Sequence, residues 1–519
     1  MAFVLIGFMG AGKTTVAREL AAAAGVRAID SDALLEERLG HPVAREFALH
    51  GEAAFRAQEE ELVCEVLARA GRGEVVALGG GSVTSERVRE ALAGHVTVLL
   101  DVDPATAWER VHATPGGAAR PLARDRDYFE RLHAERSDLY EDLADAILGD
   151  LPSRAAAHTL PGLDALAAAP SGARLLWASS KSGEYPVLVA RGLLDQLARS
   201  SALWPLDRSS SRSFCVSDET VAGLYGDRLG DLAGTVAIPA GEESKTLASA
   251  ERVWHELVAG GMTRADHVVA LGGGVVGDLA GFCAGTYQRG VPVVQVPTTL
   301  VAQVDSAYGG KTGVDLPNGK NYVGAYHQPS AVVADVDTLA TLPPEEAAAG
   351  YAEVLKTALI AGGDLWERVR AGGDPDPDVI FECARTKLAV VAMDERDAGL
   401  RQVLNLGHTV GHAIETVTGY SRYRHGEAVG LGLLAALRLS GQDALRGEVA
   451  ALLAARGLPT QLDDGVDPDA VLVATARDKK RRSGEAVPFV LLDAPGAARP
   501  GCQVEDGELR AAVRELSAA

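Results

Sequence analysis

The chain has 519 residues, enough for about three or four compact domains of ordinary size. Hydrophobic residues make up 47% and charged residues 23% of the sequence, which is typical of folded globular proteins and argues against extended disorder. The formal net charge of −21 argues against binding to nucleic acid or to a membrane surface, because a polyanion has to be neutralised by lysine and arginine. Clusters of basic residues are therefore candidate sites for small anions.

The cysteines and the apolar runs indicate where the protein works. The five cysteines are widely separated and form no CxxC pair, so the sequence predicts neither a disulfide framework nor a thiolate zinc site. No run reaches the roughly 18 apolar residues of a membrane span. Residues 1–10 are apolar without a basic start, and this favours a buried strand over a signal peptide. We therefore expect a soluble, cytoplasmic protein.

A phosphate-binding loop opens the chain. The segment Gly7-Phe-Met-Gly-Ala-Gly-Lys13-Thr14 fits the pattern GxxxxGK[ST], and an expected helix at 14–24 follows it. Its backbone N–H groups and the helix N-terminus can wrap the phosphates of a nucleotide. Lys13 can reach the β and γ phosphates, and Thr14 can bind Mg²⁺.

The pattern of strands and helices divides the chain into three parts. Short apolar runs alternate with helical stretches over residues 1–165, which predicts a parallel sheet wrapped by helices. A stretch rich in Ala, Pro, Gly and Ser then marks a linker, taken as 166–173. A second α/β part is expected over 174–340 and a mainly helical part over 341–519. The strands expected from apolar runs lie at 3–6, 75–78, 96–100, 267–271 and 293–296.

Several motifs follow the phosphate-binding loop in a fixed order. They are Asp30-Ser-Asp32, Gly51-Glu-Ala-Ala-Phe-Arg56-Ala-Gln-Glu59, Gly79-Gly-Gly81, Arg120-Pro-Leu, and Glu135-Arg136 ahead of Leu139-Tyr140. In this order they make the first part of the chain resemble the shikimate kinases over essentially its whole length. The resemblance implies a P-loop kinase that phosphorylates shikimate to shikimate 3-phosphate with Mg-ATP.

The same resemblance implies roles for individual residues. Asp30 would assist the magnesium ion at Thr14, and Asp32 would orient the attacking hydroxyl of shikimate. Arg120 lies in an expected lid that closes over ATP. The implied ATP-binding residues are Gly10, Ala11, Gly12, Lys13, Thr14, Thr15, Arg110 and Arg120; the shikimate-binding residues are Asp32, Arg56, Gly80 and Arg136; and the catalytic residues are Lys13, Asp32 and Arg120.

Another small-molecule kinase of the same architecture, such as a gluconate kinase, is the main rival. Arg56 and Arg136 favour shikimate, because a planar guanidinium binds a carboxylate through two hydrogen bonds. The sequence leaves a related polyol acid open.

A glycine-rich turn follows the strand expected at 267–271. The segment Gly272-Gly-Gly-Val-Val-Gly-Asp278 opens a helix and can hold a pyrophosphate. It lacks the spacing GxGxxG, so a tight structural turn is an equal alternative. The segments Gly241-Glu-Glu-Ser-Lys245 and Pro297-Thr-Thr299 add polar groups at neighbouring loops, where such folds bind ligands beyond the carboxyl ends of their strands.

Two histidines lie four residues apart in Asn405-Leu-Gly-His408-Thr-Val-Gly-His412, so they project from one face of a helix as paired metal ligands do. Glu353 and His425 bring the number of candidate ligands to four. A catalytic metal needs three protein ligands and an open position, and spacing alone leaves open which candidate drops out.

The stretch from about 174 to 500 resembles 3-dehydroquinate synthase. Besides the glycine turn and the histidine block, the matching motifs are Arg289-Gly, Gln303-Val-Asp305, Gly309-Gly-Lys311-Thr, Gly319-Lys320-Asn321, Glu353-x-x-Lys356, Lys387, Arg401-x-x-x-Asn405 and Asp478-Lys479-Lys480. The resemblance implies a Rossmann-like α/β NAD domain followed by a mainly α-helical metal-binding domain. It assigns Glu353, His408 and His425 to zinc (or cobalt) and leaves His412 facing the substrate.

The implied reaction converts 3-deoxy-arabino-heptulosonate 7-phosphate to 3-dehydroquinate and phosphate, with NAD⁺ used catalytically beside the divalent metal. The implied catalytic residues are Asp305, Lys311, Lys356 and His412. The implied NAD contacts are Asp218, Glu242, Lys245, Gly273, Gly274, Asp278, Thr298, Thr299, Lys311 and Lys320. The implied substrate contacts are Arg289, Asp305, Asn321, Lys356, Lys387, Arg401, Asn405, His412 and one of Lys479 and Lys480.

One position departs from this family. Asp397 stands where the family more often has glutamate, so the carboxylate sits on a shorter arm, and we expect it to keep its role in orienting neighbours. The rivals for this half are relatives that cyclise other sugar phosphates and metal-dependent alcohol dehydrogenases of similar architecture. A polyol dehydrogenase would not need so dense a set of lysines and arginines.

Together the two halves predict a bifunctional enzyme of the shikimate pathway, which leads to chorismate and the aromatic amino acids. An alternative is an active synthase whose N-terminal domain only binds nucleotide and regulates or stabilises it. The joint presence of Lys13, Asp32, Arg56, Arg120 and Arg136 argues against this alternative, because a pure binding module could lose the lid arginine. We expect small-molecule substrates, no nucleic-acid or membrane partner, and a homodimer formed through the synthase half.

Overall fold

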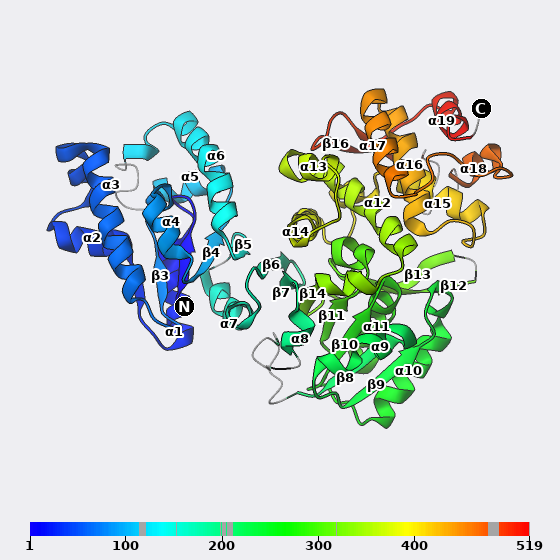
Figure 1. The fold of residues 1–519 in the computed structure, drawn as a ribbon, viewed down its shortest axis with the longest axis horizontal. Helices are drawn as coiled ribbons and strands as arrows, with labels where there is room; N and C mark the ends of the chain where they lie inside the picture. The colour runs from blue at the N-terminus through cyan, green and yellow to red at the C-terminus, as the bar shows by residue number, and fades with distance from the viewer. Residues whose placement is uncertain are drawn as a thin grey trace. The chain divides into compact units, whose positions relative to one another are not determined.

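The computed structural model describes residues 1–113, 121–151, 153–197, 199, 204, 211–317, 319–475 and 487–517. The chain forms two compact units, which Figure 1 shows coloured along the sequence. Unit 1 comprises Met1–Ala178, Pro186–Leu188 and Ser200–Leu206, and unit 2 comprises Ser179–Tyr185, Val189–Arg199 and Asp207–Ala519.

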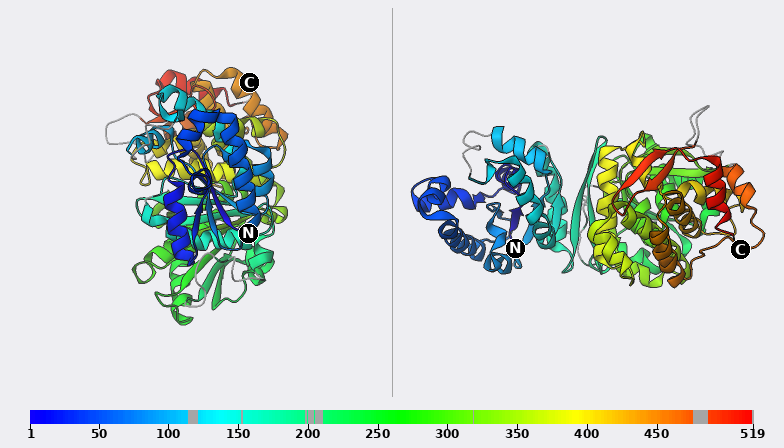
Figure 2. Two further views of the ribbon diagram at one scale, coloured as in Figure 1. Left: turned by 90° about the vertical axis from the view of Figure 1, so that its left-hand side faces the viewer. Right: turned by 90° about the horizontal axis from the view of Figure 1, so that it is seen from above.

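Unit 1 is a parallel sheet with helices on both of its faces (Figures 1 and 2). The strands run in the order β2-β3-β1-β4-β5-β6. They are β1 Phe3–Ile6, β2 Ala28–Asp30, β3 Val75–Ala77, β4 Val96–Leu100, β5 Ala146–Leu148 and β6 Arg174–Ser180. The helices are α1 Lys13–Ala24, α2 Ser31–Leu39, α3 Val43–Arg69, α4 Glu86–Leu92, α5 Pro104–Ala113, α6 Arg126–Leu143 and α7 Leu160–Ala168. Strands β1 and β4 are buried along their whole length, as the covered faces require.

A helix overlaps the start of the stretch expected as a linker. Helix α7 begins with a proline in its first turn, where the missing N–H costs nothing, and a side chain at Gly162 would press on Pro186 and Trp177. It lacks clear periodicity because several of its faces are buried. Strand β6 pairs with β5, so unit 1 extends to Ala178, a few residues beyond the expected linker at 166–173.

The first part of unit 2 is built on five parallel sheet strands, in the order β14-β11-β10-β8-β9. Its elements are α8 Leu193–Leu197, β8 Ser213–Asp218, α9 Glu219–Tyr225, β9 Gly234–Ile238, α10 Leu247–Ala259, β10 His267–Gly272, α11 Gly274–Thr286, β11 Val293–Pro297 and β14 Ala331–Asp335. Strands β12 Lys311–Leu316 and β13 Gly319–Tyr326 form an antiparallel hairpin beside it. Strand β7 Gly183–Ala190 precedes α8.

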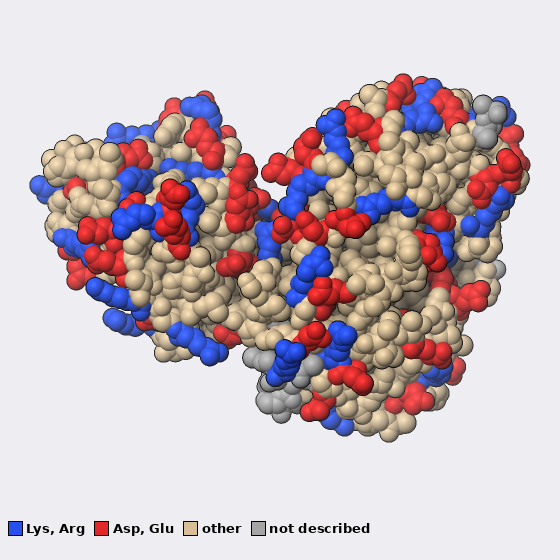
Figure 3. All heavy atoms as spheres, viewed as in Figure 1, with Lys and Arg blue, Asp and Glu red and all other residues tan. Residues whose placement is uncertain are grey.

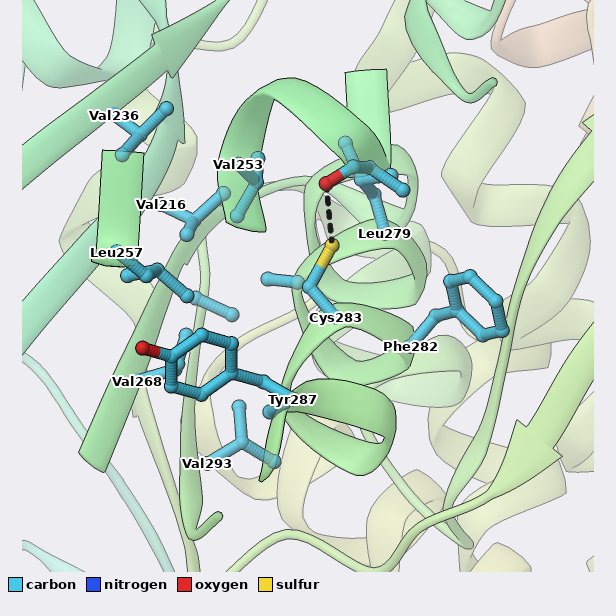
Figure 4. Close-up of a cluster of buried hydrophobic side chains, with 14 of the residues drawn as sticks. Val216, Val236, Val253, Leu257, Val268, Leu279, Phe282, Cys283, Tyr287 and Val293 are labelled. Carbon is cyan, nitrogen blue, oxygen red and sulfur yellow. Dashed lines mark hydrogen bonds between the residues drawn. The ribbon is translucent and has the colours of Figure 1, made fainter. Parts of the chain in front are cut away.

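Apolar side chains from this sheet pack against α10 and α11 (Figure 4). The labelled members are Val216, Val236, Val253, Leu257, Val268, Leu279, Phe282, Cys283, Tyr287 and Val293. Burial raises the pKa of the Cys283 thiol to about 12, so this cysteine packs as a small apolar group rather than serving as a nucleophile. All five cysteines are free thiols.

The second part of unit 2 is mainly helical, as expected, and lies above the α/β part in Figure 1. Its helices are α12 Pro344–Ala361, α13 Gly363–Arg370, α14 Pro377–Met393, α15 His408–Val417, α16 His425–Leu439, α17 Asp443–Ala455, α18 Pro468–Thr475 and α19 Asp506–Arg514. A short hairpin of β15 Phe489–Leu492 and β16 Ala498–Cys502 interrupts them. None of the helices in the described part of the chain is long and apolar enough to cross a membrane.

Candidate functional site

The phosphate-binding loop lies between β1 and α1. Gly10 and Gly12 have φ angles of 86° and 93°, in the left-handed region that glycine adopts without strain, and Gly12 caps the N-terminus of α1. Lys13 Nζ donates to the carbonyl oxygens of Gly7 and Phe8 at 2.7 and 2.9 Å, so its ammonium group lies across the loop. A helix N-terminus with an adjacent ammonium group is an anion site.

The two magnesium candidates of unit 1 are in contact. Thr14 Oγ1 donates to Asp30 Oδ2 at 2.6 Å. The other oxygen of Asp30 accepts the backbone N–H groups of Asp32 and Ala33, which caps α2. This carboxylate therefore ties the loop to the helix that carries Asp32. Of the remaining loop residues, Ala11 is buried and Thr15 is exposed.

Acidic and basic side chains meet at the glycine turn after β3. A Cβ at Gly79 would lie 2.6 Å from Asp32 Oδ1 and 2.5 Å from Glu59 Oε1, and a Cβ at Gly81 would overlap the guanidinium of Arg56. Arg56 Nη1 lies 2.5 Å from Glu59 Oε2. The absence of side chains in this turn is what allows these groups to converge.

Arg136 offers an unsatisfied donor beside the same turn. Its Nη1 is buried and has no hydrogen-bond partner in the described ranges. Tyr140, one helical turn further along α6, donates its hydroxyl to Gly80 O. Burial raises the pKa of Tyr140 to about 12, so it remains a donor at neutral pH. A buried cationic donor without a partner is costly, and a ligand carboxylate would satisfy it.

Of the other two arginines of the kinase prediction, only Arg110 lies among the described residues. Arg110, on α5, pairs with Asp150 at 2.5 Å, and both side chains are at least two-fifths exposed. Arg120 lies outside the described residues. Their roles at ATP stay predictions.

Three metal-ligand candidates meet in unit 2, each on a different helix. Donor atoms of Glu353 on α12, His408 on α15 and His425 on α16 lie within 4.8 Å of one another. The Nε2 atoms of the two histidines are 3.5 and 3.3 Å from Glu353 Oε1. Helix α16 can come this close to α15 because Gly432 has no side chain. A Cβ at this position would overlap the carbonyl oxygen of Gly407.

The outward ring nitrogens of both histidines have their own partners. Nδ1 of His408 faces Leu406 O and Nδ1 of His425 faces Glu415 Oε2, each at 3.3 Å. This pattern leaves Nε2 free to bind a metal. Neither oxygen of Glu353 accepts a well-aligned hydrogen bond from a described residue. One carboxylate and two imidazoles in this arrangement fit zinc or cobalt.

His412 lies beside this cluster and is not one of its three donors. Its ring centroid is 5.2 Å from that of His408 and 5.9 Å from that of His425. Its donor atoms group instead with those of Glu415 and His425. This placement is consistent with the predicted substrate-facing position.

A chain of buried charges leads away from Glu353. Lys356 Nζ lies 2.6 Å from Glu353 Oε2 and 2.9 Å from Asp305 Oδ2, and Lys387 Nζ donates to both the backbone oxygen of Asp305 (2.5 Å) and its carboxylate. Asp305 lies on a short π-helix, Ala302–Ser306. Both lysine side chains are at most 10% exposed. Figure 3 shows acidic and basic surface residues interleaved on one face, whereas these site charges are internal.

The pKa values in this chain follow from burial and from the neighbouring charges. Burial opposes ionisation of Asp305, but the ammonium groups of Lys356 and Lys387 outweigh it and lower its pKa to about 2. Burial lowers the pKa of Lys387 to about 8, against the attraction of Asp305. The pKa of Lys356 is raised, because two carboxylates outweigh its burial. At neutral pH Asp305 is therefore ionised and Lys387 is close to titrating.

The dinucleotide candidates form a second network at the carboxyl ends of the parallel strands. Gly273 caps α11, and its missing side chain leaves room for Thr299. Lys245 Nζ lies 2.8 Å from Asp278 Oδ2 and 3.4 Å from Glu242 Oε1, while Lys320 Nζ lies 3.8 Å from Glu242. The glycine turn thus sits among charged groups, as a pyrophosphate site would.

Two hydroxyls and one carboxylate complete this region. Thr298 Oγ1 is buried with no hydrogen-bond partner among the described residues, so it can bond a ligand without losing a protein contact. Thr299 Oγ1 instead accepts the N–H of Ala302. Asp218 accepts the N–H groups of Thr220 and Val221 and so caps α9; its contact with NAD stays a prediction.

Family models match both halves of the chain. A shikimate kinase model matches residues 9–160, and models of the N-terminal and C-terminal parts of 3-dehydroquinate synthase match residues 235–349 and 350–481. A curated 3-dehydroquinate synthase of Halorhodospira halophila is 46% identical over 347 residues, which are 63% of this chain and 94% of that protein. The chain belongs to the 3-dehydroquinate synthase family. It also carries a shikimate kinase domain, so both predicted families are confirmed.

Two solved structures resemble the synthase part. One is 2-epi-5-epi-valiolone synthase from Streptomyces hygroscopicus subsp. jinggangensis with NAD⁺ and Zn²⁺ bound: it is 29% identical with a TM-score of 0.58, covering 65% of this chain and 98% of that one. The other is 2-deoxy-scyllo-inosose synthase complexed with carbaglucose-6-phosphate, NAD⁺ and Co²⁺: it is 25% identical with a TM-score of 0.57, covering 66% and 99%. Both support the expected α/β part followed by a helical part.

The remaining substrate candidates of the synthase differ in exposure and in their protein contacts. Lys311 pairs with Asp397 at 2.6 Å and is half exposed, so the shorter carboxylate of Asp397 still reaches a lysine. Asn405 donates to Gln402 O. Arg401 is buried, and its guanidinium donates to the backbone oxygens of Glu395 and Gly309. Its protein contacts are structural, and a contact with substrate stays a prediction.

Of four further candidates, only Arg289 and Asn321 lie among the described residues, and no described contact joins either to the cluster. Among the described residues, Arg289 forms no hydrogen bond or ion pair with another candidate; it is exposed, with a φ of 72°. Asn321 is also exposed, and its backbone N–H bonds to Asp315. Lys479 and Lys480 lie outside the described residues.

Sequence reasoning assigned no role to Glu59, Tyr140 or Glu415. Each contacts a predicted site residue. Glu59 pairs with Arg56, and Tyr140 donates to the backbone oxygen of Gly80. Glu415 contacts the ring of His425. A signal for Glu415 was present, because it follows His408 by seven residues and His412 by three and therefore shares their helix face.

We expect Asp305→Asn to destabilise the metal-free synthase part by about 3–5 kcal/mol at pH 7, because two buried ammonium groups lose their shared counter-ion. The free energy of unfolding from urea titration measures this. The matched control is Lys311→Met, which removes the half-exposed pair with Asp397 and should cost about 0–1 kcal/mol. Equal effects of the two substitutions would show that Asp305 is not the centre of a buried charge network.

Proposed function

We propose that the chain performs two reactions of the shikimate pathway at two separate sites. Unit 2 would convert 3-deoxy-arabino-heptulosonate 7-phosphate to 3-dehydroquinate and phosphate, and unit 1 would transfer a phosphoryl group from ATP to shikimate. The observation that carries the first assignment is the meeting of Glu353, His408 and His425 at the end of the Lys356–Asp305–Lys387 charge chain.

The buried lysines distinguish this site from that of a polyol dehydrogenase. A neutral polyol would gain nothing from two ammonium groups next to the metal, whereas a phosphorylated sugar acid needs cationic partners for its anionic groups. Among the related synthases, the sequence favours 3-dehydroquinate synthase. Identity is 46% to that synthase from Halorhodospira halophila but 29% to 2-epi-5-epi-valiolone synthase and 25% to 2-deoxy-scyllo-inosose synthase.

The residues of unit 2 have distinct tasks in this proposal. Glu353, His408 and His425 would hold the metal. When bound, the metal would acidify a substrate hydroxyl, and NAD⁺ would accept a hydride from the carbon that bears that hydroxyl. Asp305, ionised at neutral pH, would accept a hydrogen bond from a substrate hydroxyl. Lys387 Nζ, protonated below about pH 8, would bind an anionic oxygen of the substrate.

The glycine turn would hold the dinucleotide. The N-terminus of α11 supplies backbone N–H groups for a pyrophosphate, and Thr298 Oγ1 is an unpaired buried hydroxyl beside it among the described residues. Lys245, Lys320 and Glu242 lie at the neighbouring loops. The charged pairs here would have to exchange partners when the cofactor enters.

Several contacts in unit 1 support the proposal of shikimate phosphorylation. Lys13 and the N-terminus of α1 would bind the ATP phosphates, and Thr14 with Asp30 would hold magnesium. The Nη1 of Arg136 has no hydrogen-bond partner among the described residues, and this favours a substrate with a carboxylate. Asp32, fixed by the cap that Asp30 forms, would orient the attacking hydroxyl. The lid role of Arg120 is carried over from the family.

The synthase family also motivates a proposal about assembly and location. We propose a homodimer formed through unit 2, in the cytoplasm, where the five free thiols would stay reduced. Light scattering on the purified protein should give twice the mass of one chain, and a value of one chain mass at micromolar concentration would contradict the dimer.

Separate substitutions should remove the two activities independently. Lys13→Ala should abolish ADP formation from ATP and shikimate and leave phosphate release from the heptulosonate phosphate unchanged. His408→Ala should do the reverse. Both activities are measured on the same preparations. If ATP still binds to the wild-type protein but shikimate yields no ADP, unit 1 is a regulatory module and the kinase assignment fails.

The synthase should lose activity at alkaline pH through Lys387. Burial lowers its pKa to about 8, so its positive charge is present below that pH and is lost above it. We expect kcat/KM to fall about tenfold per pH unit above pH 8, because this ratio reports groups of the free enzyme. In Lys387→Arg the charge persists, so the normalised profile should stay flat to higher pH. An unchanged alkaline limb in that variant would assign it to another group.

A further inference from the structure

Glu415 lies between the two ligand networks of unit 2. It is 2% exposed and follows His412 by one turn on α15. Its Oε2 lies 3.3 Å from His425 Nδ1, and its Oε1 lies 3.5 Å from Lys320 Nζ. One buried carboxylate thus contacts a metal-ligand candidate on one side and a dinucleotide candidate on the other.

We propose that Glu415 is a positioning residue that serves both the metal and the dinucleotide. Its Oε2 fixes the ring of His425 so that Nε2 faces Glu353, and its Oε1 anchors Lys320 at the dinucleotide loops. The inference rests on the function proposed above and adds to it a physical link between the two cofactor sites.

The metal side of this link follows from the geometry of His425. This side chain is 38% exposed, whereas that of His408 is 10% exposed, so the surrounding packing restricts His425 less. His408 is also held by the carbonyl of Leu406, and the corresponding partner of His425 is the Glu415 carboxylate. A carboxylate that accepts the outer N–H of a ligand histidine fixes its tautomer and raises its basicity.

The dinucleotide side follows from the hairpin of β12 and β13. Strand β13 is exposed at many positions, so few apolar contacts fix it. Lys320, near its start, reaches out to Glu415 on α15, to Glu242 at 3.8 Å, and to the ring of Tyr420, whose centroid is 4.7 Å away. These contacts hold the hairpin against the helix that carries the histidines. Loss of the Glu415 charge would release Lys320 from the helix.

A second metal ion is the alternative occupant of this position. The donor atoms of His412, Glu415 and His425 also lie within 4.8 Å of one another. Two observations favour the positioning role. The ammonium group of Lys320 already neutralises Glu415, and His425 would have to bind a metal through each of its two ring nitrogens.

The test measures cofactor binding rather than turnover. Metal-free full-length protein is titrated with Zn²⁺ against a chelating dye, and the zinc-loaded protein is titrated with NAD⁺ by calorimetry. Glu415→Ala should bind zinc about 10–100-fold more weakly, as for other outer partners of ligand histidines. Glu415→Gln keeps an acceptor for His425, so its zinc affinity should fall less, while its NAD⁺ affinity should fall as much as that of Glu415→Ala. Lys320→Gln should weaken NAD⁺ binding and change zinc affinity much less than Glu415→Ala does.

Controls separate the failure of this inference from that of the proposed function. His408→Ala should lose zinc binding; if it does not, the metal assignment itself is wrong. If His408→Ala loses zinc while Glu415→Ala binds it like the wild type, only the role of Glu415 is wrong. Two equivalents of zinc per wild-type chain, with one lost in Glu415→Ala, would replace the positioning role by a second metal site. Kinase activity of every variant checks that the chain is intact.

Discussion

The synthase site depends on one constraint: its charges are buried and must neutralise one another. Glu353 and Asp305 share Lys356, and Lys387 closes the series on Asp305. Because an unpaired charge in this interior would be costly, each member fixes the position of the next. The series joins helices α12 and α14 to the π-helix that carries Asp305, and so links the helical part of unit 2 to its α/β part. A metal that binds Glu353 would replace Lys356 as its counter-charge and free that ammonium group for the substrate.

Within its described residues, the kinase site binds anions without a buried series of ion pairs. Its anion-binding groups are backbone N–H donors at a helix N-terminus, together with Lys13, which rests on two carbonyl oxygens. Glycines at positions 79 and 81 let acidic and basic side chains converge without an intervening side chain. Arg136 keeps one buried donor unsatisfied among the described residues. This unit is thus prepared for a ligand anion, whereas the synthase holds internal ion pairs that its ligands must displace.

The sequence predicted residue types and elements better than it predicted partners. The motif GxxxxGK[ST] and the pair His408 and His412 follow from local spacing, and strands such as β1 and β4 follow from unbroken apolar runs, so these predictions agree with the structure. The sequence pattern did not predict helix α7, because its buried Ala and Gly positions give no amphipathic period. The contact of His425 with Glu415 depends on how closely α15 and α16 pack, which Gly432 permits and which no local pattern encodes. Likewise, the cap that Asp218 forms on α9 could be seen only once the strand and helix ends were in place.

The link through Glu415 also bears on the order of binding in the synthase. If one carboxylate holds both His425 and Lys320, a metal that draws His425 toward Glu353 also changes the charge that Lys320 experiences. If the bound metal changes the affinity for NAD⁺ in this way, thermodynamic linkage requires that bound NAD⁺ changes the affinity for the metal by the same factor. The effect is confined to unit 2, because each contact in the path from Glu242 to Glu353 is made within that unit. The kinase shares none of these residues, so fusion of the two enzymes need not imply communication between their sites.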